Sequence, residues 1–218
     1  MGLYNIKEQS KFINGMKGHK YEIFFKLMIA YQISRAELLN LRWTDIDFEN
    51  NTITIYPINK EFGKWDKNYP WHYERYDELK REYPLLQGIK STLIDENAWQ
   101  RNNSTSPNYY HGDSDYVCLR ANGKRLNGGT LSRNIQYILR DNDLPKLLYD
   151  EVRESFNKTL RELAPNSDLY LAWTRLDIQR RGSVRGENIY SDLDLNSKGF
   201  IVALNKFIET GKIQEAVM

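Results

Sequence analysis

The sequence contains little of the chemistry that disulfides and metal sites need. Cys118 is the one cysteine among 218 residues, which excludes an internal disulfide and any multi-cysteine metal site. The three histidines, His19, His72 and His111, are scattered and lack the spacing of metal ligands. These absences argue against a metalloenzyme and are typical of a reducing cytoplasm, so we expect no metal and no other cofactor.

Long apolar runs are also absent. The longest, Ile23–Tyr31, is interrupted by Lys26 and is too short to span a bilayer. No basic segment followed by an apolar stretch opens the chain, so we expect neither a secretory signal nor a membrane partner. With 40% hydrophobic residues, 28% charged residues and a mean hydropathy of −0.69, the composition is that of a soluble globular domain with a sizeable core.

A strong charge of either sign is missing as well. The formal net charge is +2, so the distribution of charge says more than its total. Residues 117–140 hold five basic side chains and no acidic one, and residues 175–185 hold four arginines against one aspartate. These segments predict either a phosphate-binding face or solvated helix surface. The candidate DNA-binding residues are Arg120, Lys124, Arg125, Arg133, Arg140, Arg153, Arg175, Arg180, Arg181 and Arg185.

Hydrophobic periodicity predicts a mainly helical α+β domain with a small antiparallel β-sheet. Apolar residues recur at helical spacing in Tyr21–Ala30, and Ser34 is placed to cap a helix over Arg35–Leu41. Alternating β-branched residues predict a strand over Thr52–Tyr56. Further helices are expected over residues 5–14, 74–83, 88–99, 131–141 (started by Thr130 or Ser132), 149–164, 169–179 and 198–207, a strand over 115–119, a loop over 100–112, and a hairpin with a second strand within 59–70.

Several short strings resemble the catalytic domain of the tyrosine recombinases, the phage-integrase family. The string AELLNLRWTDID, residues 36–47, and the strand after it are similar to the family's first box. Residues 116–126 and the helix after them resemble the middle of that domain. The string YDEVRESFNKTL, residues 149–160, resembles the second box, which is usually His-x-x-Arg followed by a helix. Residues 181–190 end in a tyrosine near the position of the family nucleophile.

The resemblance implies a particular chemistry. In this family a tyrosine hydroxyl attacks a DNA phosphodiester and forms a covalent 3′-phosphotyrosine. Two arginines clamp the nonbridging oxygens, a hairpin lysine protonates the leaving hydroxyl, and a histidine assists proton transfer. Double-stranded DNA is therefore the implied partner.

This chain matches the family set in part. The first clamp arginine falls on Ser34, and Arg35 follows one residue later, about 100° further round a helix. Arg35 is therefore either catalytic or a surface or DNA-phosphate contact. Lys60 is a candidate for the hairpin lysine, with Lys64 and Lys67 as alternates, and solvated surface is the other role for these lysines.

In the second box Asp150 stands at the histidine position, whereas Arg153 occupies the second clamp position. The alternative role for Arg153 is that of a helix arginine paired with a neighbouring glutamate.

The third box matches loosely. Its histidine position falls on Arg181, and Tyr190 lies at a sensible distance after it. Because the chain holds 15 tyrosines, packing and nucleophilic roles for Tyr190 carry equal weight. The implied catalytic candidates are Tyr190, Arg153, Lys60, Arg35 and Arg181, in a degenerate site that lacks one arginine and two histidines.

The expected organisation is one integrase-like domain over residues 1–218. It carries an unassigned aromatic-rich insert at about 69–112 and an amphipathic docking helix at about 198–209, which packs on its own core or gives self-association. The family's N-terminal core-binding domain is expected to be absent, unless the chain is a fragment.

The expected function is that of a DNA-binding regulator, repressor or accessory factor of phage or mobile-element origin. Its expected location is the bacterial cytoplasm, in association with the nucleoid. The alternatives are an active recombinase and a protein-interaction module built on the insert.

Overall fold

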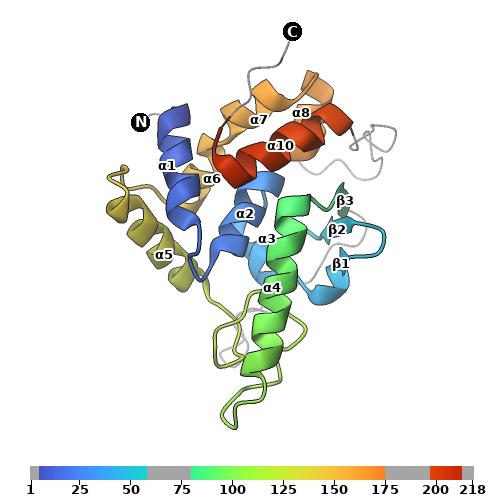
Figure 1. Cartoon of the computed structure of the whole chain (residues 1–218), viewed down its shortest axis with the longest axis vertical. Coiled ribbons are helices and arrows are strands. Elements are labelled where there is room, and N and C mark those ends of the chain that lie inside the picture. The colour runs from blue at the N-terminus through green and yellow to red at the C-terminus, as the bar shows by residue number, and fades with distance from the viewer. Residues whose placement is uncertain (1–4, 58–79, 175–196, 213–218) are drawn as a thin grey trace.

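The computed structural model describes residues 5–57, 80–174 and 197–212, in which a small sheet lies at one side of a mainly helical domain (Figure 1). This arrangement confirms the expected α+β, mainly α architecture. The elements, in chain order, are α1 (Ile6–Met16), α2 (Glu22–Tyr31), α3 (Arg35–Asn40), the 3₁₀ turn η1 (Trp43–Asp45), β1 (Ile46–Asp47), β2 (Thr52–Ile55), β3 (Arg81–Pro84), α4 (Gln87–Asn103), α5 (Gly128–Asp141), α6 (Tyr149–Ser155), α7 (Asn157–Leu163), α8 (Ser167–Thr174) and α10 (Lys198–Thr210).

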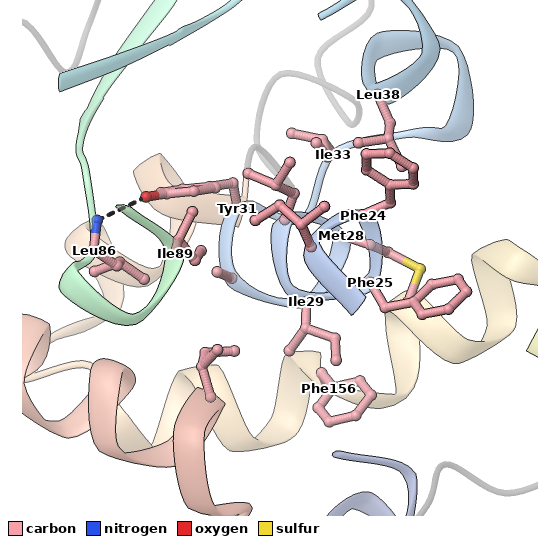
Figure 2. Close-up of a cluster of buried hydrophobic side chains, with 14 of the residues drawn as sticks. Phe24, Phe25, Met28, Ile29, Tyr31, Ile33, Leu38, Leu86, Ile89 and Phe156 are labelled. Carbon is pink, nitrogen blue, oxygen red and sulfur yellow. Dashed lines mark hydrogen bonds between the residues drawn. The ribbon is translucent and has the colours of Figure 1, made fainter. Parts of the chain in front are cut away.

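Helix α2 forms the centre of the core. Every residue from Ile23 to Tyr31 is buried, as expected of a helix that is apolar on nearly all sides. Figure 2 shows Ile29 pointing toward Phe156, which lies between α6 and α7. On another side, the Tyr31 hydroxyl donates to the Pro84 carbonyl and accepts from the Leu86 N–H, both at 3.0 Å. Helix α2 is thereby tied to the segment that joins β3 to α4.

The sheet has the strand order β1-β2-β3, and both pairings are antiparallel. Ile53 pairs with Tyr83 across β2 and β3, and both side chains enter the core. The predicted strand over 52–56 is confirmed as β2. The predicted helix over 74–83 is wrong at its end, because residues 81–84 pair with β2 along its whole length. Residues 58–79, which include the expected hairpin within 59–70, lie outside the described residues.

Helix α4 extends further than the sequence predicts. It runs to Asn103, so residues 100–103, expected to begin a loop over 100–112, form the last turn of the helix. Gln100 explains the extension, because its amide nitrogen donates to Glu96 at 2.9 Å and to the Val117 carbonyl at 2.7 Å. A polar residue that reads as a loop position is therefore buried inside the fold.

The middle of the chain departs from two further predictions. Residues 115–119 form isolated bridges, Arg42 with Tyr116 and Leu119 with Arg125, rather than a strand. Helix α5 begins at Gly128, before the expected caps at positions 130 and 132. The Asn127 side chain caps it by accepting from the Thr130 N–H at 2.8 Å.

The predicted helix over 149–164 is divided into α6 and α7 at Phe156. The cause is the Ser155 carbonyl, which accepts at 2.7 Å from the Gln9 side chain of α1. The Phe156 N–H donates to the Arg153 backbone carbonyl, three residues earlier, at 3.2 Å. This is a tighter turn than a continuous α-helix would have. Helix α8 starts at Ser167 rather than at the expected residue 169, and residues 175–179 lie outside the described part.

Helix α10 confirms the predicted tail helix and packs on its own domain. It contacts α1, α2, α4 and α7, and in Figure 1 it crosses the top of the molecule beside α7 and α8. Phe200, Leu204, Phe207 and Ile208 are buried. Phe200 meets the ring of Trp173 edge-on at 4.9 Å. The apolar face of α10 is thus a component of the core.

The docking of α10 predicts a large difference between two substitutions on that helix. Leu204→Ala should lower the free energy of unfolding by about 2–5 kcal/mol, because Leu204 is fully buried and leaves a cavity. Val202→Ala is the control, since Val202 is 65% exposed, and it should cost less than about 1 kcal/mol. Urea denaturation measures both. Equal, small effects would mean that α10 does not pack on its own domain in solution.

Candidate functional site

The turn between α2 and α3 forms the first wall of the site. Helix α2 ends at Gln32, whose backbone is left-handed with φ of 51°. Ser34 then caps α3: its hydroxyl accepts from the Glu37 N–H at 3.3 Å, and the Glu37 carboxylate accepts from the Ser34 N–H at 2.7 Å. The predicted cap at Ser34 is confirmed, and this hydroxyl is committed to holding the helix start.

A buried ion pair anchors this turn to the sheet. Arg81 of β3 donates to the Glu37 carboxylate at 2.9 Å, and the two side chains are only 11% and 8% exposed. Arg81 also donates to the Tyr83 hydroxyl at 2.5 Å. The Tyr83 hydroxyl in turn donates to the Trp173 carbonyl of α8 at 3.0 Å. The chain of contacts fixes α3, β3 and α8 relative to one another.

Helix α6 meets the same turn from the other side. The Tyr149 hydroxyl donates to the Ile33 carbonyl at 3.2 Å, and burial raises the pKa of this tyrosine well above its usual value. One turn further along α6, Arg153 makes a long hydrogen bond of 3.5 Å to the Gln32 carbonyl. Two segments more than 100 residues apart in the chain thus converge on residues 32–34.

Carboxylates surround the Arg153 guanidinium on its outer side. Its Nη2 lies 3.3 Å from the Asp150 carboxylate and 3.8 Å from that of Glu154. The Arg153 side chain is 13% exposed, whereas those of Asp150 and Glu154 are 62% and 58% exposed. The guanidinium therefore contacts the Gln32 carbonyl through one nitrogen and faces two solvent-exposed carboxylates through the other.

Arg35 points to a different element. Its Nη1 donates to the Ser132 hydroxyl of α5 at 3.2 Å. A side chain at Gly128 would bring a Cβ to 3.0 Å from Arg35 Cδ, so the glycine leaves room for the arginine stem over the start of α5. Arg35 and Arg153 therefore engage different partners.

Arg125 is a brace within the fold. Its Nη2 donates to the Leu39 carbonyl at 2.7 Å and to Asn40 Oδ1 at 2.9 Å. The guanidinium lies 3.8 Å from the centre of the Tyr116 ring. Burial lowers the pKa of Arg125. This arginine ties the 119–125 turn to the end of α3.

The sequence was compared with protein-family models and with curated proteins. No family model matches the chain. Among curated proteins it is similar to a tyrosine recombinase XerC-like protein of Caldanaerobacter subterraneus subsp. tengcongensis. The two are 23% identical over 168 residues, which is 73% of this chain and 43% of that protein.

Two solved structures share the arrangement. XerA recombinase gives a TM-score of 0.59 at 13% identity, over 80% of this chain and 56% of that one. A post-cleavage complex of XerH site-specific recombinase bound to palindromic difH substrate gives 0.55 at 16% identity, over 93% of this chain and 50% of that one. The fold is that of a tyrosine recombinase catalytic domain. This chain spans about half the length of the relatives that it matches.

The turn over residues 32–34 lies directly before the string 36–47 that resembles the first box. Its Gln32 and Ile33 carbonyls accept from Arg153 and Tyr149 of α6, which lie in the string 149–160 that resembles the second box. Arg35 is directed to α5. The candidates Lys60, Arg181 and Tyr190 lie outside the described residues, as do Arg175, Arg180 and Arg185.

The predicted DNA-binding residues that the structure describes are unevenly placed. Arg133 and Arg140 of α5 are exposed, and Arg140 pairs with Asp141 at 2.7 Å. Lys124 is exposed, and its ammonium lies 5.9 Å from the centre of the Tyr110 ring. Arg120 is half-buried. The Arg125 guanidinium, in contrast, is hydrogen-bonded within the fold, to the Leu39 carbonyl and Asn40.

Sequence reasoning missed two residues that shape the site. Arg81 lies in the segment predicted as helical, and it stands on a strand because residues 81–84 pair with β2. Gln100 accepts from the Trp43 indole N–H at 3.1 Å and so holds the first-box tryptophan. Nothing in the local sequence marks this long-range contact.

Neither a metal cluster nor a membrane helix occurs in the described part of the chain. Within residues 5–57, 80–174 and 197–212, no group of three or more histidine, cysteine, aspartate or glutamate side chains is arranged to hold a metal ion. In the same ranges no helix is long and apolar enough to cross a membrane.

The buried pair of Glu37 and Arg81 gives a test of how the turn is held. Glu37→Ala should lower the free energy of unfolding by about 3 kcal/mol or more, because it removes a cap and leaves the Arg81 charge buried without its carboxylate. Glu82→Ala on the same strand is the control, since Glu82 is exposed. Equal urea midpoints for the two variants would contradict this role.

Proposed function

We propose that this protein binds double-stranded DNA through a tyrosine recombinase fold whose active site has decayed. It acts as a regulator, repressor or accessory factor of phage or mobile-element origin. The observation that carries the proposal is the contact of Tyr149 and Arg153 of α6 with the turn over residues 32–34. By the family resemblance, Ser34 of this turn stands at the position of a clamp arginine, and Asp150, 3.3 Å from Arg153, stands at that of a histidine.

DNA as the partner is supported by the fold and by the surface of α5. The XerH structures are complexes with difH substrate. On this chain, residues 117–140 hold no acidic side chain, and Arg133 and Arg140 are exposed on one helix. Exposed arginines can neutralise phosphates and release counterions, which requires no sequence-specific contact.

Loss of strand cleavage follows from the chemistry of the two substituted positions. The Ser34 hydroxyl is neutral and occupied by the Glu37 N–H, so it cannot clamp a phosphoryl oxygen as a guanidinium would. Asp150 is a carboxylate 3.3 Å from the remaining clamp candidate, Arg153, and adds negative charge where the transition state already accumulates it.

The second candidate function is an active recombinase. It would use Arg35, Lys60, Arg153, Arg181 and Tyr190, forming a 3′-phosphotyrosine intermediate. The observation in its favour is that Arg153 lies against the turn over residues 32–34, in a fold shared with the recombinases.

DNA binding should depend steeply on salt. A protein that neutralises several phosphates loses orders of magnitude in affinity between low and moderate salt. Arg133→Ala should flatten the slope of log K against log salt by about 0.9, the loss of one phosphate contact. Lys158→Ala on α7 removes the same charge from an exposed helix outside the predicted DNA-binding set and is the control. Fluorescence anisotropy on a short duplex measures both, and an affinity indifferent to salt would refute the DNA-binding proposal.

The decayed-site proposal predicts that no covalent DNA adduct forms. The protein is incubated with a nicked half-site that traps a phosphotyrosine, and the mixture is run on a denaturing gel. We expect no shifted band from the unaltered protein. A shifted band that disappears in Tyr190→Phe would overturn the decayed-site proposal and establish the active recombinase instead.

A further inference from the structure

The guanidinium of Arg153 has an asymmetric environment. Its Nη1 faces the Gln32 carbonyl at 3.5 Å, on the buried side. Its Nη2 faces Asp150 at 3.3 Å and Glu154 at 3.8 Å, and both carboxylates are more than half exposed. One positive charge is therefore covered by two negative charges on the side from which a ligand would arrive.

Stability does not account for this arrangement. Although Arg153 is only 13% exposed, both carboxylates are more than half exposed, so water and salt screen these pairs and reduce their contribution to stability. An acidic residue in the first turn of α6 interacts favourably with the helix dipole whether or not it contacts an arginine. The Gln32 carbonyl accepts from Nη1, so this bond does not use Nη2. The contact of Asp150 with Nη2 instead alters what Arg153 offers to a ligand.

An approaching phosphate would compete with Asp150 for the same donor. Arginine binds carboxylates and phosphates with the same N–H groups, so an oxygen at Nη2 has to displace the Asp150 carboxylate or lie beside its charge. Glu154 adds repulsion from the other side at a longer distance.

We propose that Asp150 is an intramolecular competitor that holds down the affinity of Arg153 for DNA phosphate. The inference rests on the proposed DNA-binding function and adds a determinant of its strength. Asp150 acts through Arg153 and is a positioning residue rather than a DNA contact. Neutralising Asp150 without changing its shape should release Nη2 for one more phosphate contact.

The test compares two substitutions that remove one negative charge each. Asp150→Asn should tighten binding to a short DNA duplex roughly tenfold at low salt and steepen the salt slope by about 0.9. Glu162→Gln is the matched control. Glu162 is a half-exposed helix residue, and its carboxylate lies 3.8 Å from the Lys158 ammonium. This substitution should change affinity by less than about twofold, since an exposed pair of this kind is largely screened.

A double-mutant cycle assigns the gain to Arg153. Arg153→Gln keeps a polar side chain on α6 but removes the positive charge and the Nη2 donor. In that background Asp150→Asn should improve affinity no more than Glu162→Gln does, because the released donor no longer exists. Thermal melts of all the variants verify that each one is folded.

The outcomes separate the two proposals. If the unaltered protein binds DNA but Asp150→Asn has no more effect than Glu162→Gln, the competitor role is wrong and the DNA-binding function stands. If the gain persists in the Arg153→Gln background, Asp150 repels DNA generally and the competitor role is again wrong. If neither the unaltered protein nor Asp150→Asn binds DNA at low salt, the proposed function fails, and the inference fails with it.

Discussion

The buried carbonyl groups at the end of α2 are the constraint on which the site depends. The last carbonyls of a helix have no partner within the helix, and a buried one must find a donor elsewhere. Because α2 is enclosed by the core, its donors come from side chains of other elements. Three bonds come from other elements: Trp173 to the Ala30 carbonyl at 2.6 Å, Arg153 to the Gln32 carbonyl at 3.5 Å, and Tyr149 to the Ile33 carbonyl at 3.2 Å. The C-cap residue of α2, Gln32, adds a local bond to the Ile29 carbonyl at 2.9 Å.

This requirement brings distant parts of the chain to one place. Trp173 stacks beside Tyr31 at 5.9 Å and meets Tyr83 at 5.0 Å, so α8 and β3 close over the same helix end. Tyr149 and Arg153 do the same from α6. The turn over residues 32–34 is consequently held by the core beneath it and by α6 beside it. A site built there is rigid because its backbone is already satisfied.

The sequence predicts the parts of this structure that local rules decide. The cap at Ser34, the helix periodicity of α2 and α10 and the alternation of β2 depend on residues close together in the chain. The errors fall where a distant partner decides. Residues 81–84 become a strand because β2 pairs with them. The helix over 149–164 breaks because Gln9, more than 100 residues away, takes the Ser155 carbonyl. The contact of α6 with Gln32 and Ile33 joins segments more than 100 residues apart and cannot be derived from spacing along the chain.

Counting charged residues in the sequence likewise does not show which arginines can bind a phosphate. Arg125 belongs to an acid-free segment of the sequence, yet its guanidinium is spent on the Leu39 carbonyl and the Tyr116 ring. Arg153 lies among acids, yet its guanidinium reaches the Gln32 carbonyl at the end of α2. What an arginine offers to a phosphate depends on the partners that already occupy its N–H groups, and those partners are set by the fold. For Arg153 the partner at Nη2 is the Asp150 carboxylate at 3.3 Å, which no count of basic residues along the chain reveals.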